Sequence, residues 1–175
     1  MTQFDSIIIG DESLTQHCAE TLLKQGHSIA VFVTGNPELS KWAQSRNIRV
    51  EPHGRDLGAR IGTVSVDWVL SIANLKILPK DVIKLGRKGA VNFHDGPLPR
   101  HAGLNAPVWA LLEGETNHGI TWHLIEDGVD TGDILVQRSV EGSNDDTALT
   151  LNTKCYEAAL SSFPDLLSEL TEGLP

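Results

Sequence analysis

The chain has 175 residues, of which 40% are hydrophobic and 21% charged, a balance typical of one globular domain with its own core. Its net charge of −9 at pH 7 argues against a sequence-independent grip on nucleic acid, which requires a basic surface. The two cysteines lack the number and spacing of a disulfide framework. No leader peptide or run of about 20 apolar residues is recognisable, so we expect a soluble, cytoplasmic protein without a membrane or nucleic-acid partner.

Strand and helix patterns alternate through the first half of the chain. Continuous apolar runs closed by turn residues predict strands over 6–10, 29–33, 48–50 and 66–72. Helical spacing of apolar residues predicts helices over 13–25 and 36–46, the second capped by Asn36 with Pro37 in its first turn. The polar, glycine-rich residues 51–62 are expected to form mostly loop.

The second half of the chain continues with a less regular pattern. We expect a short helix over 79–86, strands over 89–93, 120–125 and 134–137, and a helix over 106–113. A long helix from Thr147, capped by residues 144–146 and with Leu149 on its apolar side, must kink or restart at Pro164. Together the elements predict an α/β, Rossmann-like fold: a mostly parallel open sheet with helices on both faces and one antiparallel addition.

The turn after the first predicted strand does not suit a nucleotide cofactor. It lacks the Gly-x-Gly-x-x-Gly pattern and is not a P-loop. The acidic residues Asp11 and Glu12 would repel a pyrophosphate at the following helix N-terminus. We therefore interpret residues 10–14 as a plain capped turn and disfavour nicotinamide or ATP chemistry.

Two short stretches offer side chains suited to catalysis. Asn92 and His94 end a predicted buried strand and point to the same face, because side chains alternate along a strand. Ligands of open α/β sheets bind at the carboxyl ends of strands. The later stretch 127–133 presents carboxylates in a glycine-framed turn, among them Asp130. An amide, an imidazole and a carboxylate can stabilise an oxyanion and move protons; the alternative is a hydrogen-bonded structural pair in a turn.

Other types of site find less support in the sequence. Residues 127–133 lack the rest of a calcium-binding loop, and the histidines at 53, 101, 118 and 123 show no metal-ligand spacing, so we predict no metal and treat them as surface or core residues. No activated serine or cysteine nucleophile is recognisable, which favours direct transfer.

The proline-rich loop 96–103 could form a wall over the substrate or an ordinary connector between elements. Basic residues near it form either a solvated surface or a rim for an anionic substrate arm: Lys84, Arg87, Lys88, Arg100 and His101.

In combination, these motifs resemble the folate-dependent formyltransferases. The resemblance is clearest over residues 66–140 and runs through Asn-x-His at 92–94, the Leu-Pro loop at 97–103, a helix, a strand, and Asp-x-x-Asp-x-Gly at 127–132. It implies 10-formyltetrahydrofolate as the formyl donor and Asn92, His94 and Asp130 as catalytic residues. It also implies two segments that line the pterin pocket, represented by Lys76, Ile77, Leu78, Ile83, Ile125, Glu126, Asp127 and Val129.

Departures from the common family form bear on the substrate. The His-Asp-Gly-Pro-Leu-Pro form at 94–99 replaces His-x-Ser-Leu-Leu-Pro, and residues 10–13 lack the Gly-Asn-Gly-Ser loop of glycinamide ribonucleotide enzymes. The sequence looks most like formyltransferase domains of nonribosomal peptide and polyketide synthases. That resemblance implies a catalytic domain over 1–175 excised from a multidomain synthase, acting on an aminoacyl group held by the phosphopantetheine arm of a carrier protein.

Two alternatives remain open at this stage. One is a formyltransferase acting on a free small-molecule amine, such as an amino-sugar nucleotide or N-hydroxyornithine. The other is a catalytically inactive formyltransferase-like module that binds folate or a partner, although Asn92, His94 and Asp130 are all retained.

Overall fold

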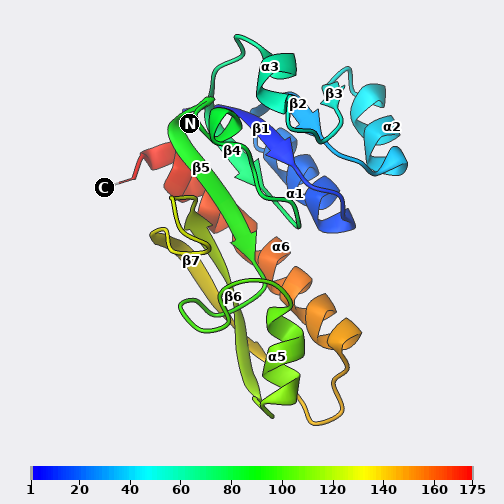
Figure 1. Cartoon of the computed structure of the whole chain (residues 1–175), viewed down its shortest axis with the longest axis vertical. Coiled ribbons are helices and arrows are strands. Elements are labelled where there is room, and N and C mark those ends of the chain that lie inside the picture. The colour runs from blue at the N-terminus through cyan, green and yellow to red at the C-terminus, as the bar shows by residue number, and fades with distance from the viewer. Residues whose placement is uncertain (1, 175) are drawn as a thin grey trace. The chain divides into compact units, whose positions relative to one another are not determined.

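The computed structural model describes residues 2–174, which form two compact units that meet in sequence between Val91 and Asn92. The first unit contains β1 (Asp5–Ile9), α1 (Ser13–Lys24), β2 (Ser28–Val33), α2 (Pro37–Ser45), β3 (Arg49–Glu51), α3 (Leu57–Ile61), β4 (Val66–Ser71), α4 (Lys80–Ile83) and most of β5 (Gly86–His94) (Figure 1). The second unit takes the end of β5 and continues with α5 (Ala106–Leu112), β6 (Asn117–Leu124), β7 (Ile134–Glu141) and α6 (Ala148–Glu172).

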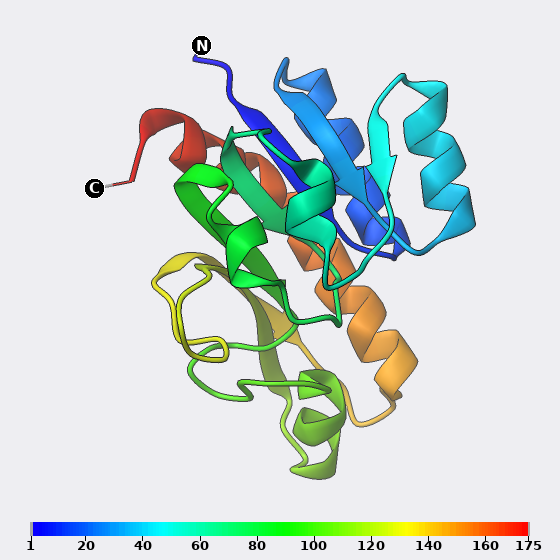
Figure 2. The same ribbon diagram turned by 45° about the horizontal axis from the view of Figure 1, so that its top comes forward.

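Parallel pairing organises the sheet of the first unit, whose strands run in the order β3-β2-β1-β4-β5. β1 is parallel to both β2 and β4, and β2 is parallel to β3, so that Ile8 lies opposite Phe32 on one side and Leu70 on the other. Strands covered on both faces need continuous apolar sequence, and Ile7, Ile8 and Ile9 are indeed fully buried. The predicted α/β, mostly parallel architecture is confirmed, and Figure 2 shows α1 and α2 beside these strands from a second angle.

A network around Asp11 fixes the first turn of this unit. Its carboxylate accepts hydrogen bonds from the Gly35 amide at 2.6 Å, the Thr34 hydroxyl at 3.1 Å and His53 Nε2 at 2.9 Å. Burial tends to raise the pKa of Asp11, but these donors outweigh it and hold that pKa below its ordinary value. Glu12 is the N-cap of α1 and forms a capping box with Thr15. The acidic residues of this turn thus have structural partners, as a plain capped turn requires.

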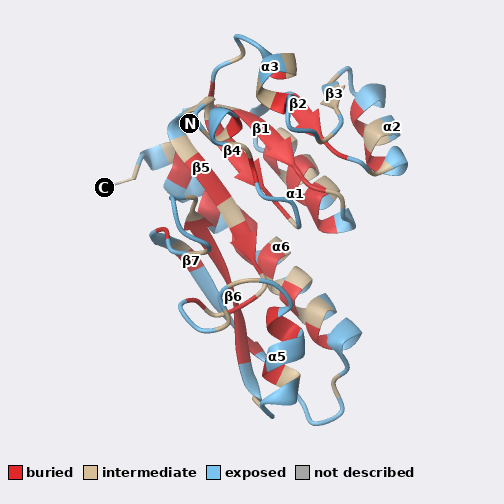
Figure 3. Cartoon of the chain, viewed as in Figure 1, coloured by how far each residue is buried: buried red, intermediate tan, exposed pale blue. Residues whose placement is uncertain are grey.

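The second unit is built on an antiparallel pair with a long helix against it. β6 and β7 pair antiparallel with Ile120 opposite Arg138, as expected from their close spacing, and α6 packs on both strands. Trp122 is the centre of its core: its ring lies 5.1 Å from that of Phe93 and 5.4 Å from that of Phe163, and its indole N–H donates to Ser162. Figure 3 shows β6 buried along most of its length, whereas β7 is largely exposed.

Several local predictions are confirmed and others are wrong. The Asn36 side chain accepts from the Glu38 amide and caps α2 as predicted. Residues 51–62 were expected to form loop, yet they contain α3, because Leu57 and Ile61 stand one helical turn apart and both are buried. β5 and β7 are longer than their apolar cores suggested.

The long helix α6 departs from its prediction in two ways. Its N-cap is Thr147, which shares a capping box with Thr150, rather than a residue of 144–146. Leu149 is 75% exposed, so the apolar face begins at Leu151. The helix continues through Pro164 without restarting. Among residues 2–174, no helix combines the length and apolar character needed to cross a membrane.

Candidate active site

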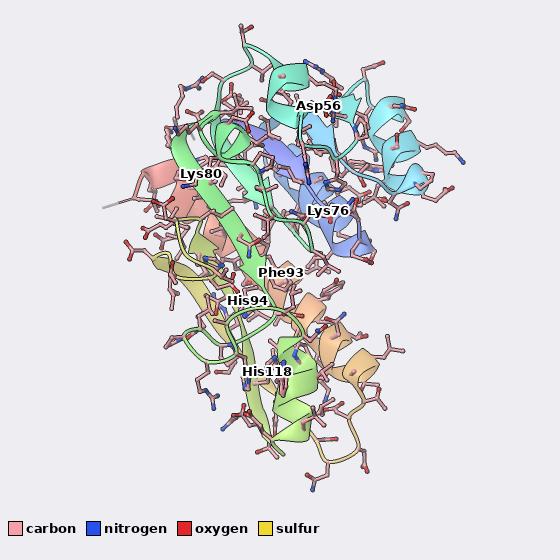
Figure 4. The ribbon with its side chains drawn as sticks, viewed as in Figure 1. Asp56, Lys76, Lys80, Phe93, His94 and His118 are labelled. Atoms are coloured by element: carbon pink, nitrogen blue, oxygen red, sulfur yellow. The ribbon has the colours of Figure 1, made fainter. Side chains whose placement is uncertain are left out.

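Asn92 and His94 both lie in the second unit, at the carboxyl end of β5. Asn92 is half-buried and His94 is 5% exposed; Figure 4 labels His94 where the strand ends. As strand alternation predicts, both side chains join one hydrogen-bonded network, whose central residue is Asp130.

Asp130 is held in the loop between β6 and β7 with an unusual backbone conformation. Its φ is +52°, in the left-handed region that costs energy for most side chains but that Asp tolerates better than most. The Gly103 amide donates to its Oδ2 at 2.8 Å. The same Oδ2 lies 3.4 Å from His94 Nδ1, and Oδ1 lies 3.4 Å from His123 Nε2. The structure therefore brings all three predicted catalytic residues together.

Both ring nitrogens of His94 face oxygen atoms. Nε2 faces the backbone carbonyl of His101 at 2.7 Å, while Nδ1 faces the Asp130 carboxylate. Both partners are acceptors when Asp130 is ionised, so each ring nitrogen that carries a proton has a partner for it. Neither nitrogen is free, and donation to a substrate requires Nε2–H to exchange the His101 carbonyl for the new acceptor.

The pKa of Asp130 is shifted so that it stays ionised. Partial burial alone would raise this pKa, but the hydrogen bonds from His123 and the Gly103 amide and the nearby positive charge of His94 outweigh it and lower the pKa. A carboxylate that remains charged can orient the imidazolium and accept a proton from an attacking amine.

His123 also belongs to this network, although the sequence alone predicts only a surface or core residue there. It is buried on β6, and its Nδ1 donates to the Leu124 carbonyl at 2.8 Å. Its Nε2 lies 3.3 Å from Asn92 Nδ2 and 3.4 Å from Asp130 Oδ1. A neutral ring accepts the Asn92 N–H, and a charged ring donates to Asp130 instead. Side chains alternate along β6, so His123 and Thr121 point to the same face. This alternation is the sequence pattern that could have indicated the place of His123 in the network.

The loop over residues 96–103 is held mainly through its backbone. The buried Thr121 hydroxyl donates to the Gly96 carbonyl at 2.8 Å and accepts from the Leu98 amide at 3.1 Å. Gln137 Nε2 lies 2.9 Å from both the Leu98 carbonyl and the Thr121 hydroxyl. A β-carbon on Gly96 would stand 2.7 Å from His94 Nε2, so the glycine lets this loop close against the imidazole.

The predicted donor-binding residues fall in both units. Lys76, Ile77 and Leu78 lie in the first unit and, with residues 53–55, Leu57 and Pro79, line a pocket of about 370 Å³. Ile83 ends α4 in the same unit and is not among the lining residues. The other four residues follow β6 in the second unit, where Ile125 is half-buried and the remaining three are exposed: Glu126, Asp127 and Val129. Their role in one donor site stays a prediction.

A second group of polar residues assembles close to this network. His101, Glu115 and His118 each offer a ligand atom within 4.8 Å of the others, although the two histidines show no metal-ligand spacing in the sequence. The spacing was uninformative because His101 lies in the 96–103 loop, whereas Glu115 and His118 flank the start of β6.

Comparison with known proteins shows the family and the fold of this chain. The Formyl transferase family matches residues 16–167. Methionyl-tRNA formyltransferase of Anaeromyxobacter dehalogenans strain 2CP-C is 39% identical over 94% of this chain and 58% of its own length. GDP-perosamine N-formyltransferase of Brucella melitensis is 30% identical over 62% of this chain and 42% of its own.

A solved structure shows the same fold. Phosphoribosylglycinamide formyltransferase from Anaplasma phagocytophilum superposes with a TM-score of 0.82 at 25% identity, covering 98% of this chain and 87% of that one. The fold and the network around Asp130 define an α/β protein with a cluster of ionisable side chains at a strand end. The chain belongs to the formyl transferase family. It spans about half the length of the curated relatives it matches.

Proposed function

We propose that the chain is the catalytic domain of an enzyme that transfers a formyl group from 10-formyltetrahydrofolate to a substrate amine. Membership of the formyl transferase family supports this activity. The observation that carries it is the network in which Asp130 contacts His94 directly and reaches Asn92 through His123. These are the residue types that stabilise an oxyanion and move a proton in acyl transfer.

The chain's own residues divide the proton and charge handling. The amine attacks the formyl carbon supplied by the donor, and tetrahydrofolate leaves. Asn92 Nδ2 lies 3.3 Å from His123 Nε2, and the amide donates a hydrogen to the formyl oxygen as negative charge develops there. His94, positioned beside Asp130, donates to the same oxygen or to the departing folate nitrogen. Asp130 accepts the amine proton, directly or through water.

The residues of the second unit that we assign to the formyl-donor site suit a folate. Val129 is 68% exposed and Ile125 half-buried, so the segment after β6 presents apolar surface beside the carboxylates of Glu126 and Asp127. An apolar face with nearby polar groups suits a heteroaromatic ring that carries hydrogen-bonding atoms. Contributions from Lys76, Ile77, Leu78 and Ile83 of the first unit are part of the same proposal.

For the acceptor we propose an aminoacyl group on a carrier protein in a peptide or polyketide assembly line. The His-Asp-Gly-Pro-Leu-Pro form at 94–99 supports it by resemblance, and Arg100, 56% exposed along its side chain, offers positive charge for an anionic arm. A free amine is the second candidate, because a relative from Brucella melitensis is a GDP-perosamine N-formyltransferase.

The test measures tetrahydrofolate release from 10-formyltetrahydrofolate with three acceptors: an aminoacylated carrier protein, a nucleotide-linked amino sugar, and methionyl-tRNA. We expect release with the carrier-bound amine and a loss of about 10²–10³-fold in rate in Asn92→Ala, from removal of an oxyanion donor. His94→Ala and Asp130→Asn should also lose activity, whereas His17→Ala, an exposed residue of α1, should not.

Each other outcome leads to a distinct conclusion. Release with the amino sugar or the tRNA alone would overturn the carrier-protein assignment and keep the transfer activity. Folate binding without release for any acceptor would overturn the catalytic proposal in favour of a binding module.

A further inference from the structure

His101, Glu115 and His118 form a cluster in the second unit that the proposed formyl transfer does not use. One ligand atom from each lies within 4.8 Å of the other two, and the two imidazole rings are 5.9 Å apart between centroids. Two imidazole nitrogens and one carboxylate oxygen are a ligand set used by zinc and related divalent ions. Figure 4 labels His118, which lies at the start of β6.

His118 carries the strongest indication of a missing ligand. It is only 4% exposed, and its Nδ1 has no hydrogen-bond partner. Every other buried side-chain nitrogen or oxygen of the described residues has one. Its Nε2 lies 2.7 Å from the Asp95 carbonyl and therefore carries the ring proton. This leaves Nδ1 with an unused lone pair. Metal-binding histidines commonly donate their other N–H to a backbone carbonyl in this way.

The remaining two side chains hold each other in place. His101 Nε2 lies 2.9 Å from Glu115 Oε2, and Arg100 Nη1 donates to Glu115 Oε1 at 3.0 Å. The hydrogen bond from His101 is the main cause of a lowered pKa for Glu115, which keeps the carboxylate ionised. Glu113 Oε2 is 3.8 Å from His101 Nε2 and supplies a further carboxylate at the same place. The positive charge of Arg100 repels a cation, but the two negative charges of Glu113 and Glu115 outweigh it.

We propose that His101 Nε2, Glu115 Oε2 and His118 Nδ1 bind one divalent ion of the zinc type, with water or Glu113 as the fourth ligand. Zinc–nitrogen and zinc–oxygen bonds of about 2.0–2.2 Å place tetrahedral ligand atoms about 3.3 Å apart. His101 Nε2 and Glu115 Oε2, now 2.9 Å apart, therefore move slightly apart on binding, and the ion replaces the proton between them.

Such an ion would act on the active site through the loop that carries His101. It would join residues 96–103 to the start of β6, while the Thr121 hydroxyl already joins backbone atoms of this loop to the middle of β6. The carbonyl of His101 faces His94 Nε2 at 2.7 Å, so the ion fixes an atom that positions the imidazole. We assign the site a structural role.

The test uses the 175-residue chain after treatment with a chelator, titrated with Zn²⁺ by calorimetry and with Co²⁺ by visible absorption. We expect one equivalent to bind, an intense d–d spectrum typical of a low-coordinate cobalt site, and a higher melting temperature with Zn²⁺. His101→Asn suits the local φ of +56°, and Glu115→Gln keeps the side-chain shape. Each should weaken binding by about 100-fold or more, since even outer-shell changes cost 10–100-fold.

His17→Ala is the control, because His17 is exposed on α1 and outside the cluster. It should bind both ions as the unaltered chain does. The proposal is overturned if the chain fails to bind one equivalent, or if His101→Asn and Glu115→Gln bind as tightly as His17→Ala. Since these readouts measure metal and not turnover, they are independent of the formyl-transfer assay.

Discussion

Asp95 carries a charge that its surroundings oppose. Burial is the main cause of its raised pKa, and the nearby positive charge of His94 only partly compensates for it. Because the pKa in the folded state lies above that in the unfolded chain, stability is lost as the pH rises above about 3.9, the ordinary Asp value. The residue therefore reduces the stability of the second unit at neutral pH.

We expect Asp95→Asn to raise the free energy of unfolding at pH 7. The amide has the same shape, and it removes the cost of a buried charge while leaving intact the backbone carbonyl that accepts from His118. Chemical denaturation at pH 7 and pH 3 checks this, and the two proteins should converge at pH 3, where the wild-type carboxyl is neutral. A less stable variant at pH 7 would mean that attraction to His94 outweighs burial.

At the scale of elements, β6 supports the loop over residues 96–103. Thr121 bonds both the Gly96 carbonyl and the Leu98 amide from a fully buried position. Thr121→Val keeps the shape of the side chain but leaves these groups without that partner. We expect a loss of about 1–3 kcal/mol in stability and a lower turnover, because the loop also places the carbonyl of His101 and the amide of Gly103.

The matched control is Thr116→Val, whose side chain is exposed just before β6. It should change the free energy of unfolding by less than about 0.5 kcal/mol, as for most surface substitutions. Equal effects at both positions, measured by urea denaturation, would show that the loop does not depend on Thr121.

How far the sequence predicts this molecule depends on whether the signal is local. The strands β1, β2 and β4 and the cap of α2 follow from apolar runs and capping residues, and the position of Asn92 and His94 on one face of β5 follows from strand alternation. His123 joins the site through contacts across strands, and His101 joins it through a loop. No characteristic spacing in the sequence predicts contacts of either kind. α3 was missed because two buried apolar residues outweigh a polar composition.

For the whole molecule, charge and paired carboxylates act in opposite directions as the pH falls. The net charge of −9 at pH 7 produces self-repulsion that decreases toward the isoelectric point of about 5.1. Asp11 and Asp130 have lowered pKa values, so their stabilising contribution is present above about pH 3.9 and is lost as the pH falls through their folded-state pKa values. Maximum stability should therefore lie near pH 5–6.

The double variant Asp11→Asn and Asp130→Asn tests the acid side of this profile. It should be less stable than wild type at pH 6 and should lose less stability between pH 5 and pH 3, because the two linked protonations are gone. Urea denaturation across this range measures both quantities. Parallel pH profiles for the two proteins would show that other carboxylates, such as Glu51 beside Arg49 and Arg60, dominate acid unfolding.

The way the 96–103 loop is anchored also affects how this protein can change its acceptor. Thr121 and Gln137 grip the loop by its backbone atoms, so the side chains of Pro99, Arg100 and Ala102 are exposed. Of these, Ala102 can change without touching the bonds from Thr121 and Gln137, whereas Arg100 also donates to Glu115, the partner of His101. For the proposed reaction, a library at Ala102 would therefore vary the surface of the loop while keeping the carbonyl that meets His94.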